Sequence, residues 1–323
     1  MFTLRLFMVL GLATLALSSG SASSQSYPAK PVRVVIPWPA GGSNDIVGRT
    51  VMQKVSESLG QQFVIDNRPG ASGTIGADLV AKSPGDGYTL MVQSTTHLGN
   101  ATMYRKLPYD TLRDFVPVAL LCQQPGGLIV HPSLPVKSVK EFIALAKASP
   151  GQILYSSSGN GSAPHLSMAQ FIGLTGIKLV HVPYKGGPPA VTAIVSGETQ
   201  AMTATLATVL PQIKAGRLRL VATTSAQRLT LMPEVPTIAE TGVPGYEMSP
   251  WIAVFASGGT PNPIIDKLNG EIARALRLPD VHKSLAGQAL EPWIATPEEF
   301  AVRVKADYEK YARLIKASGA RIE

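Results

Sequence analysis

Cysteine is nearly absent from this sequence, and the side chains that usually hold metals are not clustered. Cys122 is the single cysteine among 323 residues, which excludes a disulfide framework and any cysteine-rich metal site within the chain. The five histidines include no pair four residues apart and no His-x-His sequence, patterns that recognisable zinc sites often show. We therefore expect neither a bound metal nor a cofactor.

Charged residues are also few, and the basic ones are spread along the chain. Asp, Glu, Lys and Arg make up 15% of the residues, and the formal net charge is +8. No run of four or more basic residues occurs, so we do not expect nucleic-acid binding. A mildly basic protein does attract small anions over long distances. With 45% hydrophobic residues, the chain can bury a core large enough for two lobes.

The N-terminus carries the longest apolar stretch, and residues 1–25 are typical of an export signal. Arg5 is the only charged residue there, Leu6 to Leu17 are mostly apolar, and small residues follow. Cleavage near Ala22 or Ser24 would release the mature protein into the periplasm. An uncleaved membrane anchor is the alternative, but the apolar stretch is short for a membrane span.

From residue 32 onward, short β-branched runs alternate with stretches of helical periodicity. Val47, Val51, Val55 and Leu59, for example, recur at four-residue spacing. Such alternation predicts parallel strands covered by helices. The expected strands are 32–36, 62–65, 88–92, 153–155, 178–181 and 219–222, and the expected helices are 44–59, 74–82, 138–148, 165–174, 189–196, 263–276 and 297–317.

The alternation restarts in the middle third of the chain, which predicts an α/β fold of two lobes rather than one large sheet. Extended apolar stretches near 118–121 and 251–255 bracket this middle unit, and we interpret them as two crossover segments. Each lobe is expected to be a mostly parallel sheet flanked by helices. The predicted organisation is a signal peptide at 1–25, a first part of lobe 1 at 26–122, lobe 2 at 123–250, and a return segment with C-terminal helices of lobe 1 at 251–323.

Two glycine-rich segments join a strand to the start of a helix, one in each predicted lobe. Gly41 and Gly42 precede a helix of the first lobe, and Gly159 and Gly161 precede a helix of the second. Glycine lets the backbone approach a ligand, and a helix start carries free N–H groups and partial positive charge. The pair could therefore grip the two ends of one anion. A tight turn and a flexible surface loop are the alternatives for the two segments.

Three further residues are candidates for the same cleft. Ser94 and Thr95 follow the third expected strand at its carboxyl end, where ligands of open α/β sheets bind. Tyr184 ends a strand of the second lobe and could either line the cleft or pack between the lobes.

Signatures of catalysis are weak. No Gly-x-Ser-x-Gly nucleophile elbow occurs, and we predict no catalytic residue. A Ser/His/Asp constellation assembled by folding stays open, because its members need not be close in sequence. A periplasmic hydrolase acting on a carboxylate ester, with Ser158 as its serine, is therefore one alternative function.

Six short motifs, taken in order, resemble one family of transport receptors. They are PWPAGGSND at 37–45, NRPGASG at 67–73, SPGDGYTL at 83–90, SGNGS at 158–162, VPYKG at 182–186 and PEVPT at 233–237. Behind an export signal, this series resembles the substrate-binding proteins of tripartite tricarboxylate transporters, the Bug family. The resemblance covers nearly all of the mature chain. It implies a two-lobed periplasmic binding protein, a clamshell of the type II kind, that closes on its ligand.

The resemblance also implies which residues contact the ligand. The candidates are Trp38, Ala40, Gly41, Gly42 and Asn44 in the first lobe and Ser158, Gly159, Gly161, Ser162 and His165 in the second, with Ser94, Thr95, Tyr184 and Thr203 as further candidates. Asp45 is assigned to capping the helix or pairing with Arg49. The family often has phenylalanine and proline where Trp38 and Ala40 stand, and an acidic residue near Gln200. Trp38 could stack on an aromatic acid or brace its loop.

The expected function is capture of a dicarboxylate, a tricarboxylate or an aromatic acid and its delivery to a tripartite tricarboxylate permease. The expected partners are this ligand and the permease subunits, and the protein is expected to be a monomer. A sensor that presents the ligand to a membrane signalling protein is the second alternative, since it needs the same clamshell.

Overall fold

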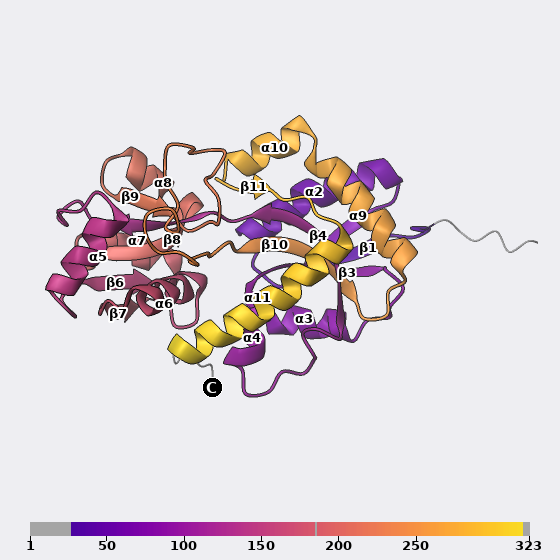
Figure 1. Ribbon diagram of the computed structural model, residues 1–323. Helices are drawn as coiled ribbons and strands as arrows, with labels where there is room; N and C mark the ends of the chain where they lie inside the picture. Colours follow the sequence, from indigo (N-terminus) through magenta and orange to yellow (C-terminus); the bar gives the residue numbers. More distant parts are fainter. Residues whose placement is uncertain (1–26, 185, 319–323) are drawn as a thin grey trace, which may run out of the picture.

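The computed structural model describes residues 27–184 and 186–318, which form two lobes side by side (Figure 1). The expected signal peptide lies outside the described residues. Each lobe is built on one β-sheet with helices on both faces. Within the described part of the chain, no helix has both the length and the apolar character needed to cross a membrane.

The first lobe contains a six-stranded sheet in the order β11-β4-β10-β3-β1-β2. Its strands are β1 Val32–Ile36, β2 Phe63–Asn67, β3 Thr89–Ser94, β4 Phe115–Gln123, β10 Trp251–Ser257 and β11 Glu291–Pro292. β1 pairs in parallel with β2 and β3, whereas β10 runs antiparallel to β3 and β4. Strands β1 to β4 therefore share one direction, and the returning strand β10 is reversed together with β11.

Strand β10 shows why helices cover both faces of this sheet. Ile252 and Val254 belong to one core cluster, whereas Trp251, Ala253 and Phe255 belong to another, because successive side chains of a strand point to opposite faces. The first cluster includes side chains of α2 (Ser43–Leu59), α9 (Asn262–Leu276) and α10 (Pro279–Ala286), and the second includes those of α3 (Thr74–Ala81), α4 (Thr96–Met103) and α11 (Pro297–Ser318).

The second lobe contains a five-stranded sheet in the order β7-β6-β8-β5-β9. Its strands are β5 Gly126–Val130, β6 Leu154–Ser157, β7 Val180–Pro183, β8 Ala201–Thr205 and β9 Arg219–Thr223. Only β5, the first strand after the crossing, runs against the other four. Core side chains of one face come from α5 (Val139–Ala148) and α6 (Ala163–Thr175), and those of the other from α7 (Gly187–Val195) and α8 (Leu206–Lys214).

The chain passes between the lobes twice, and one helix packs in both. It leaves the first sheet at β4, enters the second at β5, and returns through residues 224–250 to β10. In α11, Phe300 and Val304 belong to the core of lobe 1, whereas Tyr311 and Ile315 belong to the core of lobe 2. Figure 1 shows this helix lying across the junction of the lobes.

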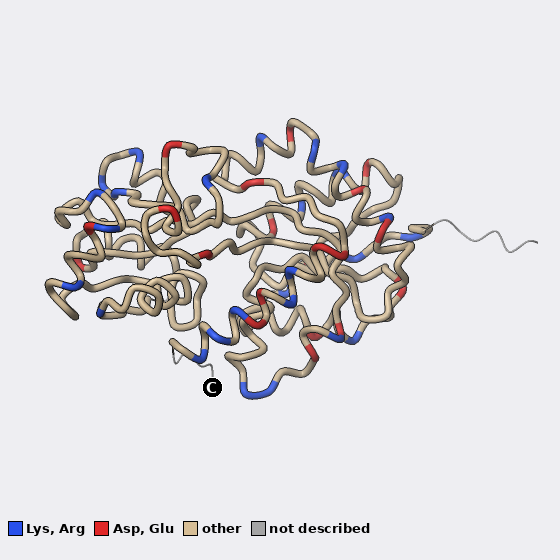
Figure 2. Tube along the Cα trace, viewed as in Figure 1, with Lys and Arg blue, Asp and Glu red and all other residues tan. Residues whose placement is uncertain are grey.

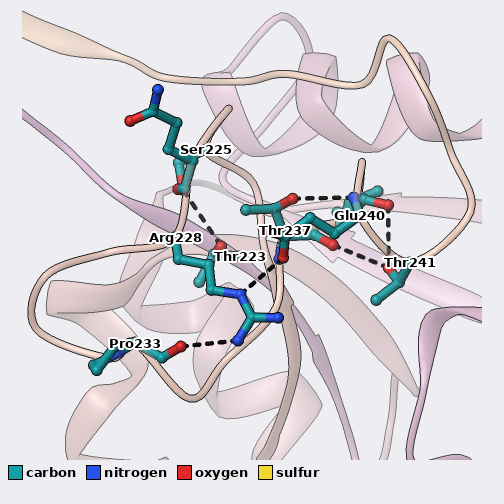
Figure 3. Close-up of polar contacts among 9 residues, drawn as sticks. Thr223, Ser225, Arg228, Pro233, Thr237, Glu240 and Thr241 are labelled. Atoms are coloured by element: carbon teal, nitrogen blue, oxygen red, sulfur yellow. Dashed lines mark hydrogen bonds and ion pairs between the residues drawn. The ribbon is translucent and has the colours of Figure 1, made fainter.

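Polar contacts fix part of the return segment 224–250, which contains no helix (Figure 3). Arg228 Nε donates to Glu240 Oε2 at 3.0 Å, and Arg228 Nη1 donates to the Pro233 carbonyl at 3.0 Å. Thr237 and Glu240 bond reciprocally, each backbone N–H donating to the other's side chain, as in a capping box. These contacts give the PEVPT motif at 233–237 a defined shape.

The strands and helices expected from periodicity are present, with ends shifted by at most a few residues. The expected direction of the strands is confirmed as well, because four of the six strands in one sheet and four of the five in the other run the same way. Helices α4, α8 and α10 and strands β5, β8 and β11 had not been expected.

Candidate functional site

A cavity of about 440 Å³ lies between the lobes and is lined by residues of both. The first lobe contributes Trp38, Ser72, Thr96, Asn100 and Met103, and the second contributes Ser158, Asn160, Gly161, Ser162, Ala163, Pro164, Gly187, Ala190, Val191, Met202, Ala204, Thr205 and Thr208. None of these described residues is charged. Figure 2 shows Lys and Arg scattered over both lobes and also along helix α11, which crosses their junction.

Four helices begin at this cavity. Thr96, Ala163 and Gly187 are the first residues of α4, α6 and α7, and Thr205 directly precedes α8. The first N–H groups of a helix have no partner within it, and the helix dipole adds partial positive charge. Proline, which has no N–H, follows Ala163 and Gly187 directly, so α4 and α8 offer more free donors than α6 and α7. The cavity is therefore suited to an anion without a cationic side chain.

The loop before α6 is held by side chains that lie behind it. The Gly161 N–H donates to His165 Nδ1 at 3.0 Å, and the Ser162 hydroxyl donates to the Gly159 carbonyl at 2.7 Å. Ser162 Oγ also accepts the His165 N–H and caps the helix. Gly159 and Gly161 have φ angles of 123° and 72°, a region that glycine enters at little cost. These bonds shape the loop, from which Ser158, Gly161 and Ser162 face the cavity.

Two stacked imidazoles support this loop. The rings of His165 and His181 lie 4.2 Å apart and nearly parallel, at 7°. His181 Nε2 lies 2.7 Å from Ser157 Oγ, which accepts the Gly159 N–H. Burial lowers the pKa of His165 to about 4, with the nearby His181 as the second cause, and burial also lowers the pKa of His181. Both rings are therefore neutral at neutral pH, as the acceptor role of His165 Nδ1 requires.

The loop before α2 is held by a carboxylate instead. The Gly41 N–H donates to Asp45 Oδ2 at 2.9 Å, and Arg49 Nε and Asn67 Nδ2 donate to Asp45 Oδ1 at 3.0 and 2.9 Å. Burial acts to raise the pKa of Asp45, but the hydrogen bonds and the charge of Arg49 outweigh it and hold this pKa below its ordinary value. The Asp45 carboxylate, in the first turn of α2, thus accepts the hydrogen bond of the Gly41 N–H. It also forms the expected ion pair with Arg49.

Trp38 is the residue of this first loop that lines the cavity. Its indole N–H donates to Gln93 Oε1, and its carbonyl accepts from Asn67 Nδ2 at 3.1 Å. Gln93 is fully buried, and its Oε1 also accepts the Ser94 N–H at 2.8 Å. The buried side chain of Gln93 therefore fixes the position of the indole ring.

The other candidate residues are not among the described residues that line this cavity. Asn44, Ser94, Thr95 and Thr203 are buried, and the Thr203 hydroxyl donates to the Pro164 carbonyl at 2.6 Å. Gly159 and His165 accept hydrogen bonds that shape the loop before α6. Ala40, Gly41 and Gly42 are in the loop before α2. The Tyr184 hydroxyl donates to Glu198 Oε1 at 2.7 Å. Contact of these residues with a ligand stays a prediction.

Several lining residues had no sequence signal of their own. Thr96 follows β3 at its carboxyl end and Thr205 is the last residue of β8. These positions are typical of ligand contacts, but β8 had not been recognised. Asn100 and Met103 lie on the unexpected helix α4. Val191 and Met202 are ordinary apolar residues of the second lobe, and only the fold brings them to the cavity.

The residues with enzymatic chemistry do not assemble into a triad in the described part of the chain. Ser157 and His181 form a Ser–His pair, but Ser157 is fully buried and the described residues place no carboxylate in hydrogen-bond contact with His181. His97 is buried among Tyr109, Phe115 and Phe255, and burial lowers its pKa to about 3. Among the described residues, no group of three or more His, Cys, Asp or Glu is placed to hold a metal.

Comparison with known proteins identifies the family. The family model of the tripartite tricarboxylate transporter family receptor matches residues 47–320. The chain is also 36% identical over 323 residues to the protein BugT of Bordetella pertussis, with 99% of each chain covered. The chain belongs to this receptor family. The resemblance inferred from the six motifs is thereby confirmed.

Two solved structures are similar to this receptor over most of its length. Rpa4515 of R. palustris, solved with adipate, is 37% identical, has a TM-score of 0.77, and the match covers 91% of this chain and 98% of that chain. MatC from Rhodopseudomonas palustris, solved with bound malate, is 31% identical, has a TM-score of 0.72, and the match covers 90% and 100%. The receptor therefore has the two-lobed fold of periplasmic binding proteins, and its relatives bind solutes.

Proposed function

We propose that this receptor captures a small carboxylate between its lobes and delivers it to the membrane permease of a tripartite tricarboxylate transporter. The observation that carries the proposal is the cavity of about 440 Å³ at which four helices begin and whose described lining is uncharged. Free N–H groups and helix dipoles can hold an anion there. Rpa4515 with adipate and MatC with malate support a carboxylate as that anion.

The proposed ligand contacts are Trp38 from the first lobe and Ser158, Gly161 and Ser162 from the second, since all four line the cavity. Closure of the lobes would exclude water, and hydrogen bonds to the carboxylate would strengthen as the local dielectric constant falls. The permease would then distinguish the closed form from the open one. Residues 1–25 would direct export and be removed near Ala22 or Ser24, so that the receptor acts in the periplasm. It would act there as a monomer.

A thermal-shift screen of the mature protein, refolded free of carried-over ligand, tests the capture step. Dicarboxylates, tricarboxylates, aromatic acids and acidic amino acids are compared with sulfate at equal ionic strength. A ligand that binds only the folded state raises Tm in a concentration-dependent way, and we expect this for at least one carboxylate class and not for sulfate. A folded protein whose Tm responds to no carboxylate would refute the proposal.

Delivery is tested by co-purification. The tagged receptor is passed over detergent-solubilised membranes of the producing bacterium with and without the carboxylate found in the screen. We expect the permease subunits to be retained more strongly with the ligand present. Retention of a membrane histidine kinase instead would assign the receptor to signalling.

A further inference from the structure

Apolar side chains form much of the wall of the cavity between the lobes. Eight of its eighteen described lining residues are apolar, among them Trp38 and Met103 from the first lobe and Pro164, Val191 and Met202 from the second. Each CH₂ group that a ligand buries against such a wall gains about 0.8 kcal/mol. The wall therefore favours a ligand with carbon-rich surface in addition to its carboxylate.

Trp38 presents carbon atoms to the cavity, because its polar atoms are bonded elsewhere. Its indole N–H donates to Gln93 and its carbonyl accepts from Asn67. The ring is thus available for stacking or edge contact with an apolar body. Gln93, fully buried beneath it, acts as a positioning residue for this surface.

Three of the eight polar side chains on the described wall already donate hydrogen bonds to carbonyl groups of the protein. The Ser162 hydroxyl donates to the Gly159 carbonyl, the Thr208 hydroxyl donates to the Thr205 carbonyl at 2.8 Å, and Asn100 Nδ2 donates to the Ser72 carbonyl at 3.0 Å. The helix-start N–H groups are donors and suit a carboxylate. A ligand hydroxyl that lies against Trp38, Val191 or Met202 would be buried without a hydrogen-bond partner, which is unfavourable.

We propose that the receptor selects carboxylates whose body is apolar, such as unsubstituted aliphatic diacids or aromatic acids, over their hydroxylated counterparts. This inference rests on the proposed function, since it concerns the ligand of the same cavity. Trp38 supplies the selecting surface, and the helix starts supply the carboxylate contact that both kinds of acid share.

Matched acid pairs measured by isothermal titration calorimetry test the inference. Adipate and galactarate have the same carbon chain and the same two carboxylates, but galactarate carries a hydroxyl on every inner carbon. Tricarballylate and citrate differ by one hydroxyl. We expect adipate to bind at least about 100-fold more tightly than galactarate, and tricarballylate about 10-fold more tightly than citrate.

Variants connect this preference to Trp38. Trp38→Ala is expected to weaken adipate about 10-fold and to leave galactarate nearly unchanged, so that the ratio between the two acids falls. Gln93→Leu, which releases the indole N–H, is expected to lower the ratio less. Trp293→Ala removes a tryptophan that lies outside this cavity and serves as the matched control, with an unchanged ratio.

The outcomes separate the two proposals. If the hydroxylated member of each pair binds as well as its counterpart, or better, the preference for an apolar body is refuted while carboxylate capture stands. A wild-type preference that Trp38→Ala leaves intact would refute the role of Trp38. If none of the four acids and no aromatic acid binds to the folded protein, carboxylate capture itself is refuted, and this inference with it.

Discussion

The loops that begin α2 and α6 have the same build, a strand followed by a glycine turn and a helix, but their N–H groups have different partners. In lobe 1 the Gly41 N–H donates to the charged carboxylate of Asp45, whereas in lobe 2 the Gly161 N–H donates to the neutral ring of His165. The Asp45 carboxylate already supplies the negative charge that the start of α2 favours. The neutral imidazole supplies no negative charge, so the partial positive charge at the start of α6 is not compensated by this residue.

This difference corresponds to the lining of the cavity. The first loop contributes Trp38 to the lining, whereas the second loop contributes Ser158, Asn160, Gly161 and Ser162. A glycine-rich helix start is therefore a better candidate for an external anion when the chain does not supply a carboxylate of its own. The following predictions test this contrast between the loops, except the last, which concerns a residue outside both.

Gly161→Val should have the largest effect, which is on ligand affinity. Its φ of 72° is strained for a β-branched residue, so residues 158–162 must rearrange, and we expect carboxylate affinity to fall about 100-fold. Gly41→Val, at a φ of 82°, should cost less than about 10-fold, because its loop contributes only Trp38 to the wall.

Calorimetry with the carboxylate found in the screen measures both losses. Gly173→Ala, in open space on α6, is the control and should leave affinity unchanged. Equal losses for Gly161→Val and Gly41→Val would show that the two loops contribute alike.

Asp45→Ala should lower stability while affecting affinity little. The substitution leaves the Gly41 N–H without its acceptor, removes one of the two acceptors of Asn67 Nδ2, and removes the ion-pair partner of Arg49. We expect the free energy of unfolding to fall by about 2 kcal/mol. Glu309→Ala removes a similarly spaced but exposed pair with Arg313 and should cost less than about 0.5 kcal/mol. Urea unfolding checks both values, and a large loss of affinity in Asp45→Ala would assign this loop to the ligand.

Acid should affect the two loops at different pH. The pKa of His165 is about 4 in the folded protein, against an ordinary value of 6.5, so the unfolded chain takes up its proton first and stability falls as pH drops from 6.5 towards 4. Lowering the pH from 7 to 5.5 should cost about 1 kcal/mol through this group. The pKa of Asp45 lies below its ordinary value of 3.8, so its contribution is lost only in stronger acid.

The measurement is urea unfolding at pH 7 and pH 5.5 for the wild type and for His165→Asn. The variant should lose about 1 kcal/mol less between the two pH values. Because His97 titrates equally in both proteins, the difference reports His165 together with its stacked partner His181. Identical pH dependence would contradict a neutral His165 behind the loop.

Tyr184→Phe should have the smallest effect. Its hydroxyl bonds to Glu198 in an exposed position, and such bonds contribute about 0.5 kcal/mol or less. Stability and affinity should therefore stay close to those of the wild type. A loss of affinity of about 10-fold would instead place Tyr184 at the ligand.

The sequence was informative about the fold where one periodicity persisted. Residues 44–59 have valine at every fourth position and form the expected helix α2, and residues 32–36 are mostly β-branched and form the expected strand β1. Helix α4 reads THLGNATM and has little helical periodicity, and strand β8 reads AMTAT, which has two threonines but no Val, Ile or aromatic residue. Their conformations depend on tertiary packing, which overrides weak local propensity.

For the site, the sequence indicated the glycine-rich loops but not the apolar residues that line the cavity. The glycine-rich helix starts indicated Gly161, and the family resemblance added Trp38 and Ser162; all three line the cavity. Met103 and Val191 carry no such pattern, since an apolar residue at a cavity looks the same in sequence as one in a core. The partner of the Gly41 N–H, the carboxylate of Asp45, likewise became evident only from the geometry.

Helix α11 has a consequence for how the molecule deforms and melts. Its first half is anchored in one core through Phe300 and Val304 and its second half in the other through Tyr311 and Ile315. Neither lobe can unfold without removing a helix on which the other depends, so calorimetric melting should show one cooperative transition. Any hinge motion must also bend this helix or slide one of its halves, and the elasticity of α11 therefore limits the amplitude of the motion.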